Sequence, residues 1–130
     1  MASRFLLDTH VLLWWLFDDP RLSEGARKII GDPESVILVS SASVWEISTK
    51  YRLGKLPQAA DVVKNLPVLL SRSRMTVLEI SQEQALAAGS LAGLHRDPFD
   101  RMLIAQAQGE DIPIITTDSA FQQYPVKICW

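Results

Sequence analysis

The segment RFLLDTHVLLWWLF, residues 4–17, contains the unit from which the fold is built. Its apolar start, Arg4–Leu7, predicts a short buried strand that ends at Asp8. Its second part, His10–Phe17, predicts a helix that the Asp18-Asp19-Pro20 segment ends. The segment therefore predicts a strand that leads into a helix, with an acidic residue at the junction.

The same alternation of short apolar runs and helical stretches continues along the chain. It predicts an α/β fold with a mainly parallel central sheet of about five strands, covered by helices on both faces. Further strands are expected at Val36–Val39, Met75–Ile80, Ile112–Thr116 and Val126–Cys129. Further helices are expected at Ser23–Ile30, Ser43–Leu53, Pro57–Ser71 with a bend at Pro67, Ser81–Leu91, Pro98–Gln108 and Ser119–Gln123.

Small polar residues and glycines mark several helix ends. Ser23 is expected as an N-cap, and Ser81 with Gln84 has the spacing of a capping box. Glycines commonly follow the last residue of a helix, so we expect helices to stop at Gly31, Gly54 and Gly109.

The bulk properties limit the class of protein. The chain has 130 residues, and we expect one domain over residues 1–130. Its 48% hydrophobic and 22% charged residues are typical of a globular protein and exclude a disordered one. The net charge of −2 excludes a protein that binds nucleic acid through overall positive charge alone. It leaves room for an enzyme that meets nucleic acid through metal ions and a local basic patch.

Cysteine usage and the apolar runs indicate the compartment. Cys129 is the only cysteine, which suits a reducing cytosol. The Met1–Asp8 segment lacks the pattern of a signal peptide, and the Val11–Phe17 run is too short to cross a bilayer. We therefore expect a cytoplasmic protein that does not associate with membranes.

Four acidic residues are expected at one edge of the sheet. Asp8 and Asp118 each follow a strand, and Glu46 and Asp100 each lie in the first turn of a predicted helix. The carboxyl ends of parallel strands share one edge, where ligands bind. Carboxylates gathered there repel one another unless a cation lies among them. The pattern predicts one or two Mg²⁺ or Mn²⁺ ions, which would activate a water for phosphodiester hydrolysis.

Local capping is the alternative for each acid taken singly, because helix starts favour acidic side chains. Capping alone does not explain why all four acids gather at one edge, so we favour the metal site. The local alternatives are a helix cap for Asp8, a capping box with Ser43 for Glu46, a first-turn acid behind the Asp97 cap for Asp100, and a cap on Ser119–Gln123 for Asp118.

The segments around these acids resemble PIN-domain nucleases and, more narrowly, the VapC-like toxins of bacterial toxin–antitoxin pairs. The resemblance runs over nearly the whole chain, and residues 97–101 with the apolar helix after them are its most specific part. The segments that carry it are Phe5-Leu6-Leu7-Asp8-Thr9-His10, Ser43-Val44-Trp45-Glu46-Ile47, Asp97-Pro98-Phe99-Asp100-Arg101-Met102-Leu103-Ile104-Ala105 and Ile115-Thr116-Thr117-Asp118.

The resemblance implies a three-layer α/β/α fold, Mg²⁺- or Mn²⁺-dependent endoribonuclease activity, a cognate antitoxin protein and a homodimer. It also implies that Asp8, Glu46, Asp100 and Asp118 are the family's acidic quartet, which is intact in this chain. Two alternatives stay open. One is a housekeeping PIN nuclease in RNA processing without an antitoxin, and the other is a non-catalytic PIN-fold binding module.

Other polar residues near the acids have two interpretations each. Asp97 can support the metal ligands without binding the metal itself, or it can serve only as the N-cap of its helix. Thr9 and Thr117 can orient a carboxylate or a water, or make local turn hydrogen bonds. The spacing of His10 and His95 indicates no zinc site.

Basic residues around the acids are candidates for contact with RNA. Arg101 can pair with a carboxylate of the site. Phosphate contacts from basic residues would position RNA without reading its sequence, and a solvated helix face is the alternative. The RNA-binding candidates are Lys50, Arg52, Lys55 and Arg96.

Three tryptophans are candidates for a protein interface. The Val11–Phe17 helix, which holds Trp14 and Trp15, is apolar on almost every side. Trp45 lies in the helix of Glu46. Exposed aromatic residues often mark an interface, here with the antitoxin or a second copy. The alternative places all three tryptophans in the core.

Overall fold

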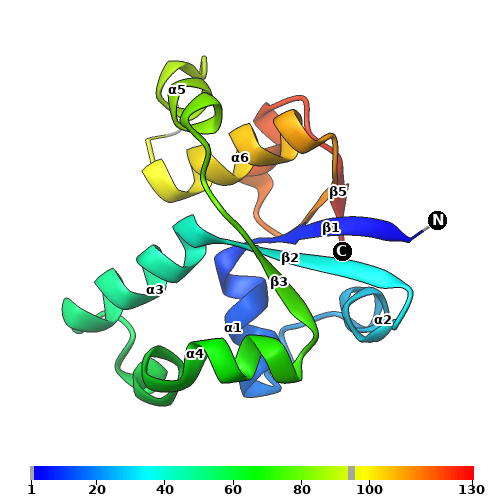
Figure 1. Cartoon of the computed structure of the whole chain (residues 1–130), viewed down its shortest axis with the longest axis vertical. Coiled ribbons are helices and arrows are strands. Elements are labelled where there is room, and N and C mark those ends of the chain that lie inside the picture. The colour runs from blue at the N-terminus through cyan, green and yellow to red at the C-terminus, as the bar shows by residue number, and fades with distance from the viewer. Residues whose placement is uncertain (1, 94–95) are drawn as a thin grey trace.

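Five parallel strands form the centre of the protein (Figure 1). The computed structural model describes residues 2–93 and 96–130, so His95 lies outside the described residues. The strands are β1 (Ser3–Leu7), β2 (Ser35–Ser40), β3 (Met75–Leu78), β4 (Ile114–Ile115) and β5 (Ile128–Cys129). The helices are α1 (Thr9–Phe17), α2 (Glu24–Gly31), α3 (Ser41–Arg52), α4 (Ala60–Arg72), α5 (Gln82–Ser90) and α6 (Pro98–Glu110), with short 3₁₀ helices η1 (Pro57–Ala59) and η2 (Ser119–Gln123).

The strand order determines where a ligand can bind. The strands lie in the order β3-β2-β1-β4-β5, and every neighbouring pair is parallel. The chain therefore builds β1, β2 and β3 in one direction and then crosses to the other side of β1 for β4. Where the strand order reverses in this way, a crevice opens beyond the carboxyl ends of the two strands. Here that place lies between the ends of β1 and β4.

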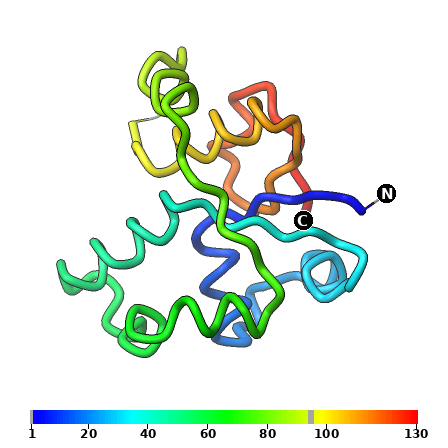
Figure 2. Tube along the Cα trace, in the orientation of Figure 1, coloured from blue at the N-terminus to red at the C-terminus, as the bar shows by residue number. Residues whose placement is uncertain are grey.

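Neighbouring strand residues face opposite sides of the sheet, and this alternation produces three layers. Leu6 packs with Leu103 and Ile104 of α6 in one buried cluster. The next residue, Leu7, packs with Val11 of α1 in the other. Figures 1 and 2 show α5 and α6 on one side of the sheet and α1 to α4 on the other. The predicted α/β/α arrangement with a parallel sheet is thereby confirmed.

Several predicted boundaries are wrong by a few residues. The helix expected from Ser43 begins at Ser41, because the Ser40 side chain accepts a hydrogen bond from the backbone N–H of Ala42. α2 ends at Gly31, which is its last helical residue and not the residue after it, whereas Gly109 lies inside α6 and does not end that helix. α6 ends instead at Asp111, whose φ of 52° is left-handed.

Two predicted features of the longer helices are confirmed. Gly54 follows α3 with a φ of 77°, a left-handed conformation that suits glycine. The predicted bend near Pro67 is present, because Asn65 in α4 has non-helical angles. Proline cannot donate a backbone hydrogen bond and crowds the preceding turn, which accounts for the bend.

The capping box at the start of α5 is present as predicted. Ser81 Oγ accepts from Gln84 N at 3.1 Å, and Gln84 Oε1 accepts from Ser81 N at 3.1 Å. Because Ala88 is the one buried residue of α5, this helix depends on its cap more than a well-buried helix would.

We expect Ser81→Ala to lower the free energy of unfolding by about 1 kcal/mol, the usual cost of losing a serine cap. Urea denaturation would measure the change. Ser90→Ala, at the other end of α5, is the control and should stay near the wild type. Equal stability of the Ser81 variant and the control would contradict a stabilising role for the capping box.

The three tryptophans differ in how far they are exposed. Trp45 is 61% exposed, whereas Trp14 and Trp15 are half-buried at the edge of the core. The alternative that places all three in the core is therefore wrong.

Among the described residues, no helix combines the length and the apolar character needed to cross a membrane.

Candidate functional site

The candidate site begins where β1 and β4 end, at the place where the strand order reverses. Asp8 directly follows β1, and Thr116 directly follows β4. The Thr116 hydroxyl donates to Asp8 Oδ2 at 2.8 Å and accepts from the backbone N–H of Asp118 at 3.0 Å. One buried threonine thus connects the segments that follow two neighbouring strands.

Asp8 is a buried carboxylate with an unusual electrostatic environment. It is 4% exposed and stands before α1, but its side chain makes no capping hydrogen bond. The capping alternative for Asp8 is therefore not realised. Burial raises the pKa of the Asp8 carboxyl above its ordinary value, and the nearby Glu46 charge raises it too. The Thr116 hydrogen bond and His10 act in the opposite direction.

Glu46 is the second buried carboxylate. Since α3 begins at Ser41, Glu46 lies in the second turn of the helix and not in the first, as the sequence had suggested. This position also excludes the capping box with Ser43. The side chain is 3% exposed. Its Oε2 is paired with the ammonium of Lys50, and its Oε1 is buried without a hydrogen-bond partner.

Asp97 and Asp100 lie at the start of α6. Asp97 Oδ1 accepts from the backbone N–H of Phe99 at 2.9 Å and of Asp100 at 3.2 Å. Asp97 is therefore an N-cap, and Asp100 lies half-buried in the first turn that the cap holds. Both carboxylates raise the pKa of Lys50, which indicates that the start of α6 lies near the Glu46–Lys50 pair.

Asp118 differs from the other acids. Its residue is exposed, and its Oδ1 accepts from the backbone N–H of Ala120 at 2.9 Å. The side chain thus caps η2, as the local alternative predicted. The backbone of Asp118 is connected to Asp8 through Thr116.

The structure distinguishes the two threonines that the sequence suggested and adds two polar residues. Thr9 is buried, and its hydroxyl donates to Ser43 Oγ at 2.8 Å, which connects α1 to α3. Thr117 is exposed. Sequence reasoning missed Thr116 and Ser43 as partners of the site. Both lie inside the segments that carry the resemblance, one residue before Thr117 and three before Glu46, and this position is the signal that could have found them.

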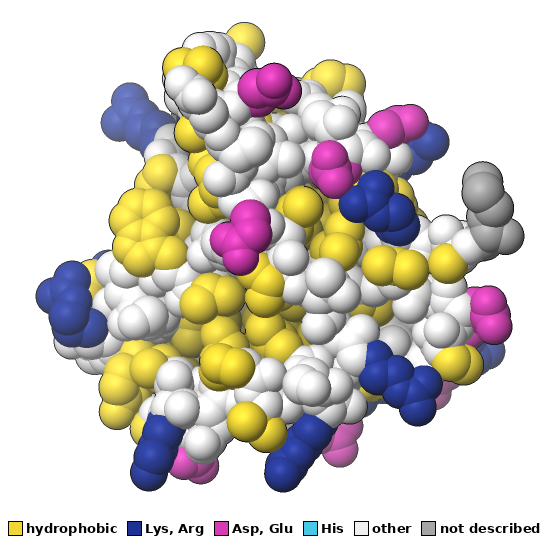
Figure 3. Space-filling model, viewed as in Figure 1, with side chains coloured by type: hydrophobic (Ala, Val, Ile, Leu, Met, Phe, Trp, Pro, Cys, Tyr) yellow, Lys and Arg dark blue, Asp and Glu magenta, His cyan; other side chains and the backbone are white. Residues whose placement is uncertain are grey.

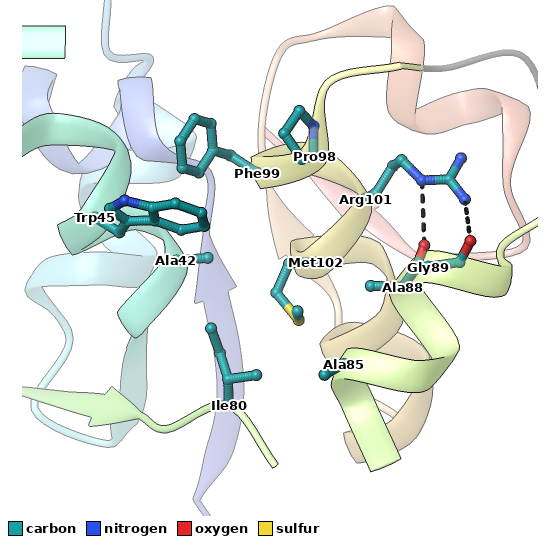
Figure 4. A pocket seen from close by; sticks show the side chains of 10 residues that line it. All are labelled: Ala42, Trp45, Ile80, Ala85, Ala88, Gly89, Pro98, Phe99, Arg101 and Met102. Carbon is teal, nitrogen blue, oxygen red and sulfur yellow. Dashed lines mark hydrogen bonds between the residues drawn. The ribbon is translucent and has the colours of Figure 1, made fainter. Parts of the chain in front are cut away.

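The basic residues do not form one group. The Arg101 guanidinium donates to the carbonyls of Ala88 at 3.1 Å, Gly89 at 3.4 Å and Leu91 at 2.6 Å, and two of these bonds are drawn in Figure 4. It therefore anchors the end of α5 against α6, a role that the sequence did not suggest. Of the four RNA-binding candidates, Lys50 lies among the acids, and the other three, Arg52, Lys55 and Arg96, are exposed.

An apolar surface lies beside the acids. Trp45 of α3 meets Phe99 of α6 edge to face, with ring centroids 5.0 Å apart. Figure 4 shows the two rings as part of the lining of a pocket, together with Ile80 and Met102. Figure 3 shows that apolar side chains gather over the middle of the face that it presents, where β3 and α4 lie in Figure 1.

The residues of the site fit a divalent metal ion in their chemistry. Carboxylate and hydroxyl oxygens are the donors that Mg²⁺ and Mn²⁺ prefer. The partnerless Glu46 Oε1 is a buried acceptor of this kind. Within residues 2–93 and 96–130, however, no three Asp, Glu, His or Cys side chains converge as a complete metal site. Asp8 and Glu46 are both buried, and the Glu46 charge acts on the Asp8 carboxyl, which indicates that the two acids lie near each other.

Comparison with known proteins identifies related sequences. The sequence profile of the PIN domain matches residues 5–127. Ribonuclease VapC16 of Mycobacterium tuberculosis is 38% identical over 65 residues, which cover 47% of this chain and 46% of that protein. The match therefore spans about half the length of this curated relative.

Two solved structures have the same fold. VapBC2 from Rickettsia felis, bound to a DNA fragment from its promoter, aligns with a TM-score of 0.72 and 18% identity over 98% of each chain. A toxin–antitoxin complex from Klebsiella pneumoniae aligns with a TM-score of 0.66 and 19% identity, covering 100% of this chain and 97% of that one. At this level of identity, the likeness concerns the fold alone.

Proposed function

The chain belongs to the PIN domain family, and from that premise we propose that it is a divalent-metal-dependent endoribonuclease, the toxin of a toxin–antitoxin pair. The observation that carries the proposal is the pair of buried carboxylates, Asp8 and Glu46, at the carboxyl edge of the sheet. Burial of two acids is costly unless positive charge compensates for both of them. The Lys50 ammonium supplies one positive charge, at Glu46, which leaves the second acid for a metal ion to compensate. The partly similar ribonuclease supports RNA as the substrate.

The side chains of the site would divide the work as follows. Asp8 and Glu46, with Asp100 and Asp118, would hold one or two Mg²⁺ or Mn²⁺ ions. When bound, such an ion supplies an activated water and stabilises negative charge on the phosphate. Thr116 fixes the Asp8 carboxylate through its 2.8 Å hydrogen bond. Asp97 fixes the first turn of α6, where Asp100 lies.

The exposed basic residues would meet the RNA backbone. Arg52 and Lys55 lie at the end of α3 and just after it, and Arg96 precedes the Asp97 cap. Contacts of this kind position a phosphate chain without reading its sequence. Because the net charge is −2, the electrostatic field of the whole protein does not attract RNA, and binding would depend on local contacts of this kind.

The proposal includes two protein partners and a compartment. The toxin–antitoxin complex with the same fold supports a cognate antitoxin. Two apolar pockets on either side of Trp45 support a homodimer, because exposed apolar patches often mark interfaces. Trp45 lines both of these pockets, the first together with Ile80 and the second together with Val77, and all three side chains are exposed. Cys129 is free, which suits a cytoplasmic location.

The test is cleavage of labelled total RNA by the purified protein in Mn²⁺ and in EDTA. We expect cuts in Mn²⁺ and none in EDTA, because the acids act only through the ion. Cleavage that persists in EDTA would contradict the mechanism, and the absence of cleavage in Mn²⁺ would contradict the assignment as a ribonuclease. A neighbouring small gene for a DNA-binding protein would distinguish a toxin from a housekeeping nuclease.

Two observations favour a second candidate, a non-catalytic PIN-fold binding module. Asp118 caps η2, and no three metal-ligand side chains converge in the described part of the chain. Calorimetric titration with Mn²⁺ discriminates the two functions. Heat of binding is expected from the nuclease, and its absence would favour the binding module.

A further inference from the structure

We propose that Lys50 is an internal counter-cation of the acidic cleft, which holds Glu46 in the metal-free protein and gives it up when a divalent ion binds. This inference rests on the proposed function. It gives Lys50 a different role from the RNA contact that the sequence suggested. Lys50 would be a positioning residue that acts through Glu46.

The geometry of α3 places Lys50 against Glu46. The two residues are four apart, so they share one face of the helix, with the acid nearer the N-terminus. The Lys50 ammonium pairs with Glu46 Oε2. The Glu46 side chain is 3% exposed and that of Lys50 is 29% exposed. This pair therefore differs from the solvated pairs that contribute little on helix surfaces.

The charges around Lys50 keep its ammonium among the acids. The negative charges of Asp97 and Asp100, at the start of α6, act on the Lys50 ammonium together with that of Glu46. The ammonium thus faces acids from two elements, α3 and the start of α6. A single positive charge lies where the proposed function requires a doubly charged ion.

The unpartnered oxygen of Glu46 shows that Lys50 satisfies the carboxylate only in part. Oε2 has the ammonium, whereas Oε1 is buried without a hydrogen-bond partner. A metal ion that binds Glu46 at Oε2 must therefore displace the Lys50 ammonium. A metal ion that binds at Oε1 is repelled by the positive charge of that ammonium. From this competition we expect Lys50 to weaken metal binding and to stabilise the metal-free fold.

The test is titration of the metal-free full chain with Mn²⁺ by calorimetry. We expect Lys50→Met to bind Mn²⁺ about tenfold more tightly than the wild type, which corresponds to about 1.4 kcal/mol. Lys64→Met makes the same change at an exposed lysine of α4 and should leave the affinity unchanged. Lys50→Arg keeps the charge and should bind Mn²⁺ much as the wild type does.

The outcomes separate this inference from the proposed function. Unchanged or weaker Mn²⁺ binding by folded Lys50→Met, beside a wild type that binds, would overturn the role of Lys50 alone. Binding of Mn²⁺ by neither protein would overturn both. Binding that appears only in Lys50→Met would contradict the proposal that the wild type releases Glu46 to the ion.

A stability measurement keeps the inference testable if Lys50→Met folds poorly. The single variant leaves Glu46 buried and unpaired, which is more costly than removing both partners. We therefore expect Glu46→Gln/Lys50→Met to melt at a higher temperature than Lys50→Met in EDTA. A double variant no more stable than the single one would contradict the role of Lys50 as the partner of Glu46.

Discussion

Replacing Asp8 by asparagine is expected to reduce Mn²⁺-dependent RNA cleavage by about 1000-fold or more, the effect of removing about 4 kcal/mol of transition-state stabilisation. Asn has nearly the same shape as Asp and can still accept the hydrogen bond from Thr116. The change therefore removes one negative charge from the site and leaves its packing unaltered. Cleavage rates on one labelled RNA at saturating Mn²⁺ would measure the loss.

Two measurements show whether Asp8→Asn acts on the site or on the fold. Because burial raises the pKa of Asp8, its charge is unfavourable in the metal-free fold, so the variant should melt above the wild type in EDTA. Mn²⁺ at 100 times its Kd should stabilise the wild type by about 2.7 kcal/mol and the variant hardly at all. Asp61→Asn, an exposed acid of α4, is the control. Cleavage by Asp8→Asn at the control's rate would overturn the assignment of Asp8.

The part of the site that lies at strand ends could be predicted from the sequence. In a parallel sheet the chain direction alone places the residue after each strand at the carboxyl edge. Asp8 needed only a correct prediction of β1 to be placed there. The N-cap role of Asp97 likewise follows from the proline after it, which is favourable in the first turn of a helix.

The exact helix boundaries could not be predicted, because the local sequence allows more than one start or end for a helix. Ser40, Ser41 and Ser43 are all good N-cap residues, and only the packing of α3 decides between them. Gly109 costs a helix about 1 kcal/mol relative to alanine. Packing of the neighbouring Ala107, which is 2% exposed, keeps α6 intact through it.

The contacts within the site could not be predicted from the sequence, because they depend on tertiary structure. Thr116 and not Thr117 meets Asp8, because the register of β4 against β1 decides which of two adjacent threonines turns inward. The spacing of Glu46 and Lys50 was visible in the sequence. Whether Lys50 faces acids or solvent depended on the approach of α6, a contact between elements far apart in the chain.

One buried aromatic side chain anchors the segment that carries Asp118 to the core. Phe121 of η2 is fully buried and packs with Leu6 and Ile114 of the sheet and with Leu103 of α6. Its backbone N–H donates to the carbonyl of Asp118 at 3.3 Å. The core on this side of the sheet and the Asp118 end of the candidate site thus depend on the same residue.

Phe121→Ala is expected to lower the free energy of unfolding by about 3–5 kcal/mol, because it removes a buried ring and leaves a cavity between the sheet and α6. In a domain of this size the melting temperature should fall by about 11–18 °C. Urea denaturation in EDTA would measure the change without a contribution from metal. Val68→Ala, at a side chain that is 50% exposed, should stay within about 0.5 kcal/mol of the wild type. A loss below about 1 kcal/mol in Phe121→Ala would contradict the packing described here, since no buried ring of this size is removed at so small a cost.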